Sequence, residues 1–335
     1  MKNKLVFKFL NFLIFFTLTF FFIFCEKRNT VNISKTDFFE NDSLIVFDLK
    51  FNIEEFEDYN EGKRYYHYAT MSYVNSESQK IVCPLRIKLH GQFRVDTNYC
   101  NMPQLKLNFE KNGAQKELFG EIDKLFLVMA CQKNVEEFQN YVIEEYLIYK
   151  MYNILTEYSF QVRLAKVNLI NTANLEDTIS SFAFFREHTD DFAKRLNGKM
   201  LETVPVNMTK INKPLLDKIV LFNYVIENQD WEVETMHNIK IICKNDSSLY
   251  PVAYDFDFAK MIYTPYSSFD STYFSTELRN YLYSNNEVIE LLKSDFIKNK
   301  NSYLQVFEQD KYLLKEVREK DILFLKNSFN KLINL

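Results

Sequence analysis

The change in hydrophobic periodicity along the sequence limits the possible folds of this chain more than any other feature. Between residues 43 and 185, short segments alternate apolar and polar residues, which is typical of half-buried β-strands. One long helix interrupts them, from about Val135 to Leu155, and beyond Asn197 the apolar residues recur at helical spacing. We therefore expect an α+β protein with most of its sheet first and most of its helices later. The expected strands are residues 43–53, 65–74, 81–89, 105–109, 125–130, 162–170 and 179–185.

The composition narrows the function classes. The chain has 335 residues, enough for two lobes or one large domain, and its 47% hydrophobic content indicates a globular protein. It contains only 5 glycines, which argues against a glycine-rich phosphate loop. The net charge is −4 and no basic stripe stands out, so we expect no nucleic-acid partner.

The N-terminus has the order of a secretory signal. Three lysines precede an apolar run from Phe9 to Phe24, and Cys25 then meets the charged residues 26–28. Cys25 at this boundary predicts lipidation, as at a bacterial lipoprotein cleavage site, although Phe24 stands where a small residue is usual. The alternative is an uncleaved membrane anchor. Both interpretations attach the chain to a membrane and place residues 43–335 outside the cytoplasm, with residues 26–42 as a tether.

The other four cysteines are Cys83, Cys100, Cys131 and Cys243. None has the spacing of a zinc site. Outside the cytoplasm a disulfide is feasible, and Cys100–Cys131 is the first candidate pair. The alternative, four buried free thiols, stays open.

Two neighbouring strands carry cations on their polar faces. In LRIKLHG, Arg86 and Lys88 lie opposite three apolar residues, and in LKLNF, Lys106 does the same. Several cations on one sheet face beside a cleft would suit a phosphate ligand. The alternative is an ordinary solvated face.

The long predicted helix carries two adjacent acids, Glu144 and Glu145. Their neighbours Val142, Tyr146 and Tyr149 form an apolar stripe, so we expect one acid to be buried and one to be exposed. A buried Glu reaching Lys106 would orient that lysine.

The stretch from Leu221 to Tyr263 holds the residue types that phosphoryl transfer needs. A helix predicted over Thr209–Asn228, with Pro214 in its first turn, leads to Asp230. Asn238 follows beside His237. A carboxylate here can orient an attacking hydroxyl. The alternatives are an Asp230 that only ends its helix and a His237 that is only structural.

A second acidic point comes after a predicted hairpin. Residues 239–243 and 249–253 flank the turn signal KNDSS, and Asp255 and Asp257 follow directly. Carboxylates together with an amide such as Asn238 are suitable Mg²⁺ ligands. An Asp-x-Asp after a strand is also common in turns and calcium sites.

These motifs, in this order, resemble a known family. FNYVIENQDWEVETMHN looks like the Asn-x-Asp-x-His-x-x-Asn catalytic loop of HipA-type kinases and of the spore-coat CotH kinases, and PVAYDFDFA looks like their metal-binding segment. LRIKLHGQFR and LKLNF are similar to the CotH turn and lysine strand. The resemblance covers roughly residues 80–265. It implies a two-lobed protein-kinase-like fold, with an antiparallel sheet lobe at residues 43–188 carrying one long helix, and a mainly helical lobe at residues 189–335.

The resemblance also implies roles in the nucleotide site. Lys106 would contact the α- and β-phosphates of ATP, with Arg86 and Lys88 nearby. Glu145 would pair with Lys106, and Glu187 would lie close to the adenine between the lobes.

The acidic residues would carry the chemistry. Asp230 would orient the acceptor hydroxyl and take its proton, and Asn238 and Asp255 would bind Mg²⁺, with Asp257 as a second ligand or a support. The implied protein is an extracytoplasmic kinase that acts on a hydroxyl of a secreted protein or an envelope glycan.

Two other functions stay open. Asn238 follows Asp230 at a longer spacing than in protein kinases, which would suit a pseudokinase-type surface lipoprotein with a binding or structural role. A metal-dependent envelope hydrolase using Asp255 and Asp257 is the third hypothesis, although the sequence lacks the ligand or triad order that such enzymes use.

Overall fold

The computed structural model describes residues 35–56, 65–91, 100–102, 104–110, 113–176, 178–268 and 286–334. Ser34–Leu335 forms one compact unit. The expected signal segment and its Cys25 lie outside the described residues. Among the helices that are described, none combines the length and the apolar character needed to cross a membrane.

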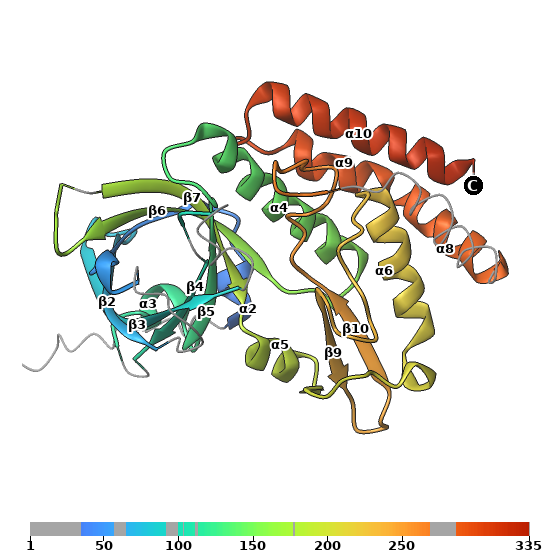
Figure 1. The fold of residues 1–335 in the computed structure, drawn as a ribbon, viewed down its shortest axis with the longest axis horizontal. Helices are drawn as coiled ribbons and strands as arrows, with labels where there is room; N and C mark the ends of the chain where they lie inside the picture. Colours follow the sequence, from blue (N-terminus) through green and yellow to red (C-terminus); the bar gives the residue numbers. More distant parts are fainter. Residues whose placement is uncertain are drawn as a thin grey trace, which may run out of the picture. The chain divides into compact units, whose positions relative to one another are not determined.

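Seven strands form a closed barrel (Figure 1). Around it the order is β1–β2–β3–β4–β5–β7–β6. Each neighbouring pair is antiparallel except β1 and β6, which run parallel and close the barrel. The strands are β1 (Ile45–Phe51), β2 (His67–Val74), β3 (Lys80–His90), β4 (Gln104–Phe109), β5 (Lys124–Met129), β6 (Val162–Asn171) and β7 (Thr178–Glu187).

Aromatic rings fill the barrel interior. Phe47 of β1 stacks on Phe185 of β7 at 5.3 Å between ring centroids. The short helices α2 (Lys35–Glu40) and α3 (Lys116–Phe119) add Phe38 and Phe119, whose ring centroids lie 4.9 Å apart. These side chains are almost fully buried, and each contributes on the order of 2–3 kcal/mol of hydrophobic stabilisation. The interior is thus a packed core.

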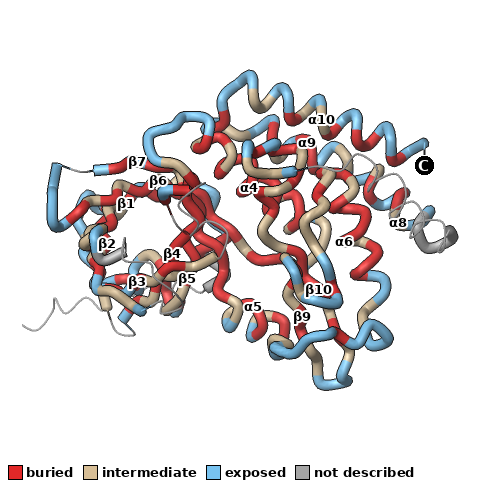
Figure 2. Tube along the Cα trace, in the orientation of Figure 1, coloured by how far each residue is buried: buried red, intermediate tan, exposed pale blue. Residues whose placement is uncertain are grey.

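The helix α4 (Glu136–Leu155) is covered on two sides. It packs against β6 and β7 of the barrel and against α9 (Lys300–Glu308) (Figure 1). Figure 2 shows it buried along most of its length. Because both sides are covered, it lacks the single apolar stripe of a surface helix.

A second, three-stranded sheet and several helices complete the fold. The sheet order is β10–β9–β8, and its longer two strands form a hairpin. The elements are η1 (Ile53–Phe56), α5 (Thr189–Arg195), β8 (Lys199–Met200), η3 (Met208–Lys210), α6 (Lys213–Val225), β9 (Ile239–Cys243), β10 (Leu249–Ala253), α8 (Asn286–Lys298) and α10 (Lys315–Ile333).

The expected two-lobed protein-kinase-like fold is wrong. The sheet is a closed mixed barrel rather than an antiparallel sheet lobe, because β1 pairs in parallel with β6 as well as antiparallel with β2. The later helices form no separate large lobe. They share one hydrophobic cluster with α4 and with Val128, Leu164 and Phe184 of the barrel strands. Alternation marks the buried face of a strand and does not name the strand beside it, so the sequence did not reveal the closure.

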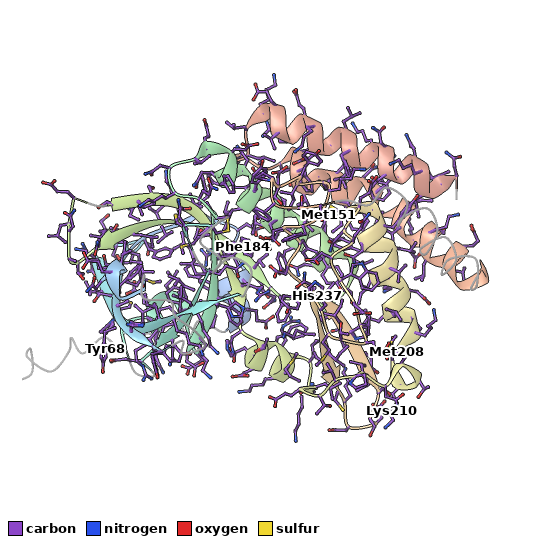
Figure 3. The ribbon with its side chains drawn as sticks, viewed as in Figure 1. Tyr68, Met151, Phe184, Met208, Lys210 and His237 are labelled. Carbon is purple, nitrogen blue, oxygen red and sulfur yellow. A yellow bond between two sulfur atoms is a disulfide. The ribbon has the colours of Figure 1, made fainter. Side chains whose placement is uncertain are left out.

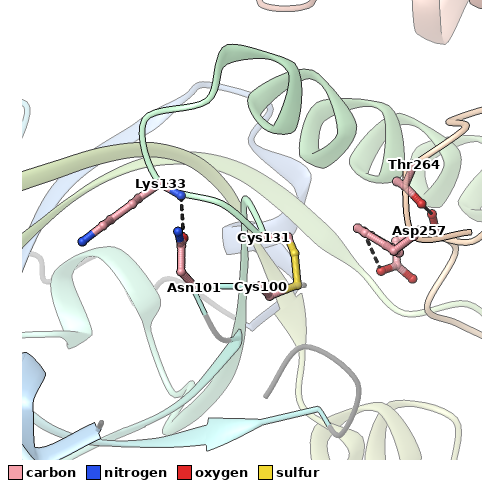
Figure 4. Close-up of a disulfide and its surroundings, with 7 residues drawn as sticks. Cys100, Asn101, Cys131, Lys133, Asp257 and Thr264 are labelled. Carbon is pink, nitrogen blue, oxygen red and sulfur yellow. Dashed lines mark hydrogen bonds between the residues drawn. A yellow bond between two sulfur atoms is a disulfide. The ribbon is translucent and has the colours of Figure 1, made fainter. Parts of the chain in front are cut away.

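A disulfide joins Cys100 to Cys131, which confirms the first candidate pair (Figure 4). It ties the segment before β4 to the residues after β5. Next to it, Asn101 Oδ1 accepts a hydrogen bond of 2.8 Å from the Lys133 amide (Figure 4). Cys83 and Cys243 are free thiols.

Candidate functional site

The C-terminal end of α6 places Asp230. Asn212 caps the start of the helix by accepting from the Leu215 amide. At the other end, the buried Asn228 side chain donates to Asn223 at 2.9 Å. Asn228 Oδ1 in turn accepts from the Asp230 amide at 3.1 Å. Because Asn223 lies within α6, these two hydrogen bonds fix the position of Asp230 relative to that helix.

The Asp230 carboxylate is held from both sides. His237 Nε2 lies 2.7 Å from Oδ1, and Asn238 Nδ2 donates to Oδ2 at 2.8 Å. Asn238 Nδ2 also lies 2.8 Å from the Asp230 carbonyl oxygen. His237, which Figure 3 labels, has an exposed side chain. The structure thus gathers the predicted Asp230 and Asn238, together with His237, into one cluster.

The hairpin β9–β10 brings Asp255 to the same place. The Tyr254 amide donates to the Asn238 carbonyl at 3.1 Å, so Asp255 begins its turn beside Asn238. Met236, Asn238 and Asp255 all have left-handed backbone, with φ of 56°, 47° and 64°. Non-glycine residues adopt this conformation at a cost of about 1 kcal/mol or more, and it is concentrated at functional sites.

Tyr149 of α4 connects this acidic cluster to a buried arginine. Its hydroxyl accepts from the Asp255 amide at 2.8 Å and from Arg186 Nη1 at 3.2 Å. Glu145, one turn earlier on α4, is buried, and so is Glu144, so the expectation that one of the two would be exposed is wrong. Burial raises the pKa of the Tyr149 hydroxyl, and Glu145 raises it further. Tyr149 therefore fixes the spacing between Asp255 and Arg186.

Arg186 lies in an aromatic cage with an unused donor. Its guanidinium is 4.8 Å from the ring centroid of Phe126, 5.3 Å from that of Phe160 and 5.0 Å from that of Tyr254. Only 4% of the residue is exposed, yet Nε has no hydrogen-bond partner in the described part of the chain. Burial alone would lower the pKa of Arg186, but Tyr149 and Asp255 outweigh it, so this buried group stays charged.

His188 offers a second unused donor. Its Nδ1 accepts from the Asp190 amide at 3.2 Å, and burial together with the Lys106 charge lowers its pKa to about 4. The ring is therefore neutral at pH 7, with its proton on Nε2. That nitrogen is buried and has no partner among the described residues. Its ring stacks on Phe126 at 5.1 Å, so it lies on the same ring as Arg186.

Two lysines add positive charge around these donors. Lys106 lies 5.7 Å from the ring centroid of Phe126, and burial and the charge of Lys88 lower its pKa. Lys240 is half-buried; burial and Arg186 lower its pKa, while Asp255 raises it. Cations held this close repel one another, so an anion bound among them would relieve the repulsion.

The β3–β4 register confirms that Lys88 and Lys106 share one face. The two residues lie directly opposite each other, and Arg86 is opposite Asn108. Arg86 and Lys88 both contact the ring of Tyr66, at 5.6 and 5.2 Å from its centroid. The charges that shift the Lys106 pKa are Lys88, Lys124 and Asp190, so its predicted pairing with Glu145 stays a prediction.

Two other predicted residues have structural partners. Glu187 is buried and forms a bidentate ion pair with Arg195, at 3.0 and 2.8 Å. Asp257 is buried and accepts from the Tyr266 hydroxyl at 3.1 Å, and its carbonyl oxygen accepts from Thr264 (Figure 4). Cys25 lies outside the described residues.

Oxygen ligands for a cation are present in the cluster. The Asn238 amide nitrogen faces Asp230, which turns its Oδ1 the other way. The Asp255 backbone follows directly after Tyr254, whose amide donates to the Asn238 carbonyl. Such donors suit Mg²⁺, which binds through one or two carboxylates and keeps several waters. Within the described ranges, no three His, Cys, Asp or Glu side chains gather in a metal-binding group.

Sequence reasoning missed Arg186, His188, Lys240 and Tyr149 as site residues. Two of them carried a signal: Arg186 directly follows the apolar run FAFF, and Lys240 is the only cation in the strand IKIIC. A charge inside a buried strand needs a partner or a ligand. Tyr149 gave no such signal, because a tyrosine in an apolar stripe looks like core.

No protein-family model and no curated protein matches this sequence. The resemblance to CotH and HipA-type kinases therefore stays a hypothesis, and the site has to be interpreted from its own geometry.

Proposed function

We propose that this protein is a magnesium-dependent phosphotransferase that moves the γ-phosphoryl group of ATP to a hydroxyl acceptor. One observation carries the proposal: Tyr149 joins the Asp230–Asn238–Asp255 cluster to a cage in which Arg186 Nε and His188 Nε2 are buried donors without partners in the described residues. Buried unsatisfied donors cost about 1–3 kcal/mol each, which a phosphate oxygen would recover.

The basic side of the site binds and orients the polyphosphate. Arg186 and His188 donate hydrogen bonds, while Lys106 and Lys240 contribute charge at its edges. Charge-assisted hydrogen bonds to phosphate are about twice as strong as neutral ones. The cage of rings around Arg186 excludes water, which strengthens these interactions.

The acidic side acts on the acceptor. Asn238 and Asp255 would hold Mg²⁺, which when bound neutralises charge on the phosphates. Asp230 accepts the proton of the incoming hydroxyl through a lone pair not used by His237 or Asn238. A bond forms between the acceptor oxygen and the γ-phosphorus as the bond from that phosphorus to the ADP oxygen breaks.

The proposed setting is outside the cytoplasm, with a secreted protein or an envelope glycan as the acceptor. The signal-like N-terminus supports this location. The disulfide Cys100–Cys131 supports it independently, because disulfides persist in oxidising compartments.

A second candidate is a nucleotide-binding surface protein without turnover. It is favoured by the two hydrogen bonds that already occupy the Asp230 carboxylate, from His237 and Asn238. These contacts would compete with an acceptor hydroxyl for the same oxygens.

The test uses the full chain, purified in detergent, with Asp255→Asn, Asp230→Asn and Asp246→Asn. Asp246 is a matched control, because it caps the exposed turn of the same hairpin through Ser248. We expect wild type and Asp246→Asn to bind ATP with Mg²⁺ and to transfer phosphate. Asp255→Asn should lose at least ten-fold in Mg²⁺-dependent binding, and Asp230→Asn should keep binding and lose transfer.

The outcomes separate the two candidates. Binding of ATP without transfer by the wild type to itself, to co-purified envelope protein or to glycan identifies the binding protein. No ATP binding by the wild type, or binding that Asp255→Asn leaves unchanged, overturns both.

A further inference from the structure

A buried acid pair connects α4 to α10, away from the site above. Glu144 of α4 and Asp321 of α10 are both 0% exposed. Among the described residues, one cation pairs with both acids: Lys320 Nζ lies 2.9 Å from Glu144 Oε1 and 3.3 Å from Asp321 Oδ1. Two buried carboxylates beside one ammonium leave one negative charge without compensation.

The remaining oxygens of the pair show where that charge is neutralised. Apart from the ion pair of Asp321 Oδ1 with Lys320, Glu144 Oε2 and both Asp321 oxygens have no hydrogen-bond partner among the described residues when both groups are ionised. A proton on Glu144 changes this, because the carboxylic acid can donate to Asp321. Burial and the Asp321 charge hold the pKa of Glu144 well above its usual range, and burial raises that of Asp321 to about 6.

The other charged groups nearby are already engaged. On α4, Glu137 accepts from the Tyr141 hydroxyl at 2.5 Å. Lys260 pairs with Glu227 at 2.7 Å. No described group therefore supplies a second cation. A cavity of about 360 Å³ beside Glu144 gives protons a path to the pair, and it is lined by Glu137, Tyr141, Lys260, Met261, Lys320 and Phe324 among others.

We propose that Glu144 and Asp321 share one proton and form a proton-dependent clasp that holds α10 against α4. With the proton, the two carboxyls attract each other through a hydrogen bond. Without it, two buried anions repel, and α10 loosens from α4.

The clasp reaches the candidate site through two connections. Glu144 is next to Glu145 and little more than one turn from Tyr149, which positions Asp255 and Arg186. At its far end, α10 places Lys331 2.8 Å from Glu227, just after α6 and before Asp230. Loosening α10 would thus disturb both supports of the acidic cluster.

The direction of the pH effect follows from the protonated state. Both carboxyls have a higher pKa in the folded protein than in the unfolded chain. The clasp therefore contributes to folding while Glu144 keeps its proton, and this contribution is lost as pH rises through the raised pKa of Glu144.

The test is hydrogen exchange of the full chain at pH 5.5 and pH 8, expressed as protection factors for residues 315–333. We expect wild type to lose at least ten-fold of this protection at pH 8. Glu144→Gln should keep its protection at both pH values, because the amide still accepts from Lys320 and always donates to Asp321. Glu137→Gln, on the same helix and cavity, should behave like wild type.

A wild-type protection factor for α10 that is equal at the two pH values overturns the clasp. So does a Glu144→Gln variant that loses protection at pH 8 as wild type does. If Glu144→Gln does not fold, Asp321→Asn replaces it, with the same expected result and the same refutation.

Discussion

Two buried arginines provide the sharpest test of the site. Arg163 donates to the Phe38 carbonyl at 2.9 Å and to Ser43 at 3.0 and 3.3 Å. Arg186 donates only to Tyr149, at 3.2 Å, and its Nε has no partner among the described residues. Both are about equally buried. Replacing each by Met keeps the apolar bulk and removes the charge, so the two variants separate a structural arginine from a ligand-binding one.

The stability effects should differ. Arg163→Met removes three charged hydrogen bonds, one of them to the buried Phe38 carbonyl, at about 1.5–3 kcal/mol for each bond and with partial overlap, so we expect a loss of about 3–5 kcal/mol. Arg186→Met loses one such bond and its contacts with three rings, worth about 0.5–2 kcal/mol each. It also removes a buried charge and an unsatisfied donor, which together cost several kcal/mol. We expect these losses and gains to cancel, so that the free energy of unfolding of Arg186→Met stays within about 2 kcal/mol of wild type.

The effects of the two substitutions on ATP binding should have the opposite order. Arg186→Met removes a charge-assisted contact with phosphate, so ATP affinity should fall at least ten-fold, about 1.4 kcal/mol. Arg163→Met should bind ATP like wild type wherever it is folded. Denaturant unfolding followed by circular dichroism measures the free energy of unfolding, and titration calorimetry with ATP and Mg²⁺ measures the affinity for ATP.

One result would refute this reasoning. If Arg186→Met loses as much stability as Arg163→Met and the folded fraction binds ATP with unchanged affinity, Arg186 is a structural residue. The unused donor would then carry no functional information, and the proposed phosphate site would be wrong.

Three further substitutions have expected outcomes. Cys131→Ser opens a loop that spans a sequence separation of 31 residues, and loop entropy predicts a loss of about 3.7 kcal/mol in the free energy of unfolding, which a reductant should reproduce in wild type alone. Tyr149→Phe should cost about 1–3 kcal/mol and lower phosphate transfer more than ATP binding, because Arg186 and a neighbouring amide lose their shared acceptor; equal effects on binding and transfer would contradict this. Arg195→Met should cost about 3–5 kcal/mol by stranding the buried Glu187, and adding Glu187→Gln should recover much of that loss in urea unfolding.

Local patterns predicted much of the local structure. The hairpin strands β9 and β10 occupy Ile239–Cys243 and Leu249–Ala253, as the turn signal KNDSS indicated. The long helix was expected from Val135 and begins at Glu136. These elements can be predicted from the sequence because hydrophobic periodicity and turn residues act over only a few positions.

The candidate site was only half readable. Asp230, Asn238 and Asp255 come from one stretch of chain, and their residue types and order singled them out as candidates. Arg186 and Tyr149 come from a strand and a helix far away in the sequence, and no local pattern shows that they lie beside this stretch. Glu187 was also misinterpreted for this reason: the sequence shows a glutamate at this position but does not show that it pairs with Arg195.

The sequence by itself determined which segments become strands and helices, and which face of each is apolar. Only the tertiary structure decided what covers those faces. The parallel pairing of β1 with β6 joins Ile45 to Ala165 and closes the barrel that the sequence pattern did not predict. The physical reason is that apolar burial is non-directional: periodicity records that a face is buried, while the partner depends on contacts between residues more than a hundred positions apart.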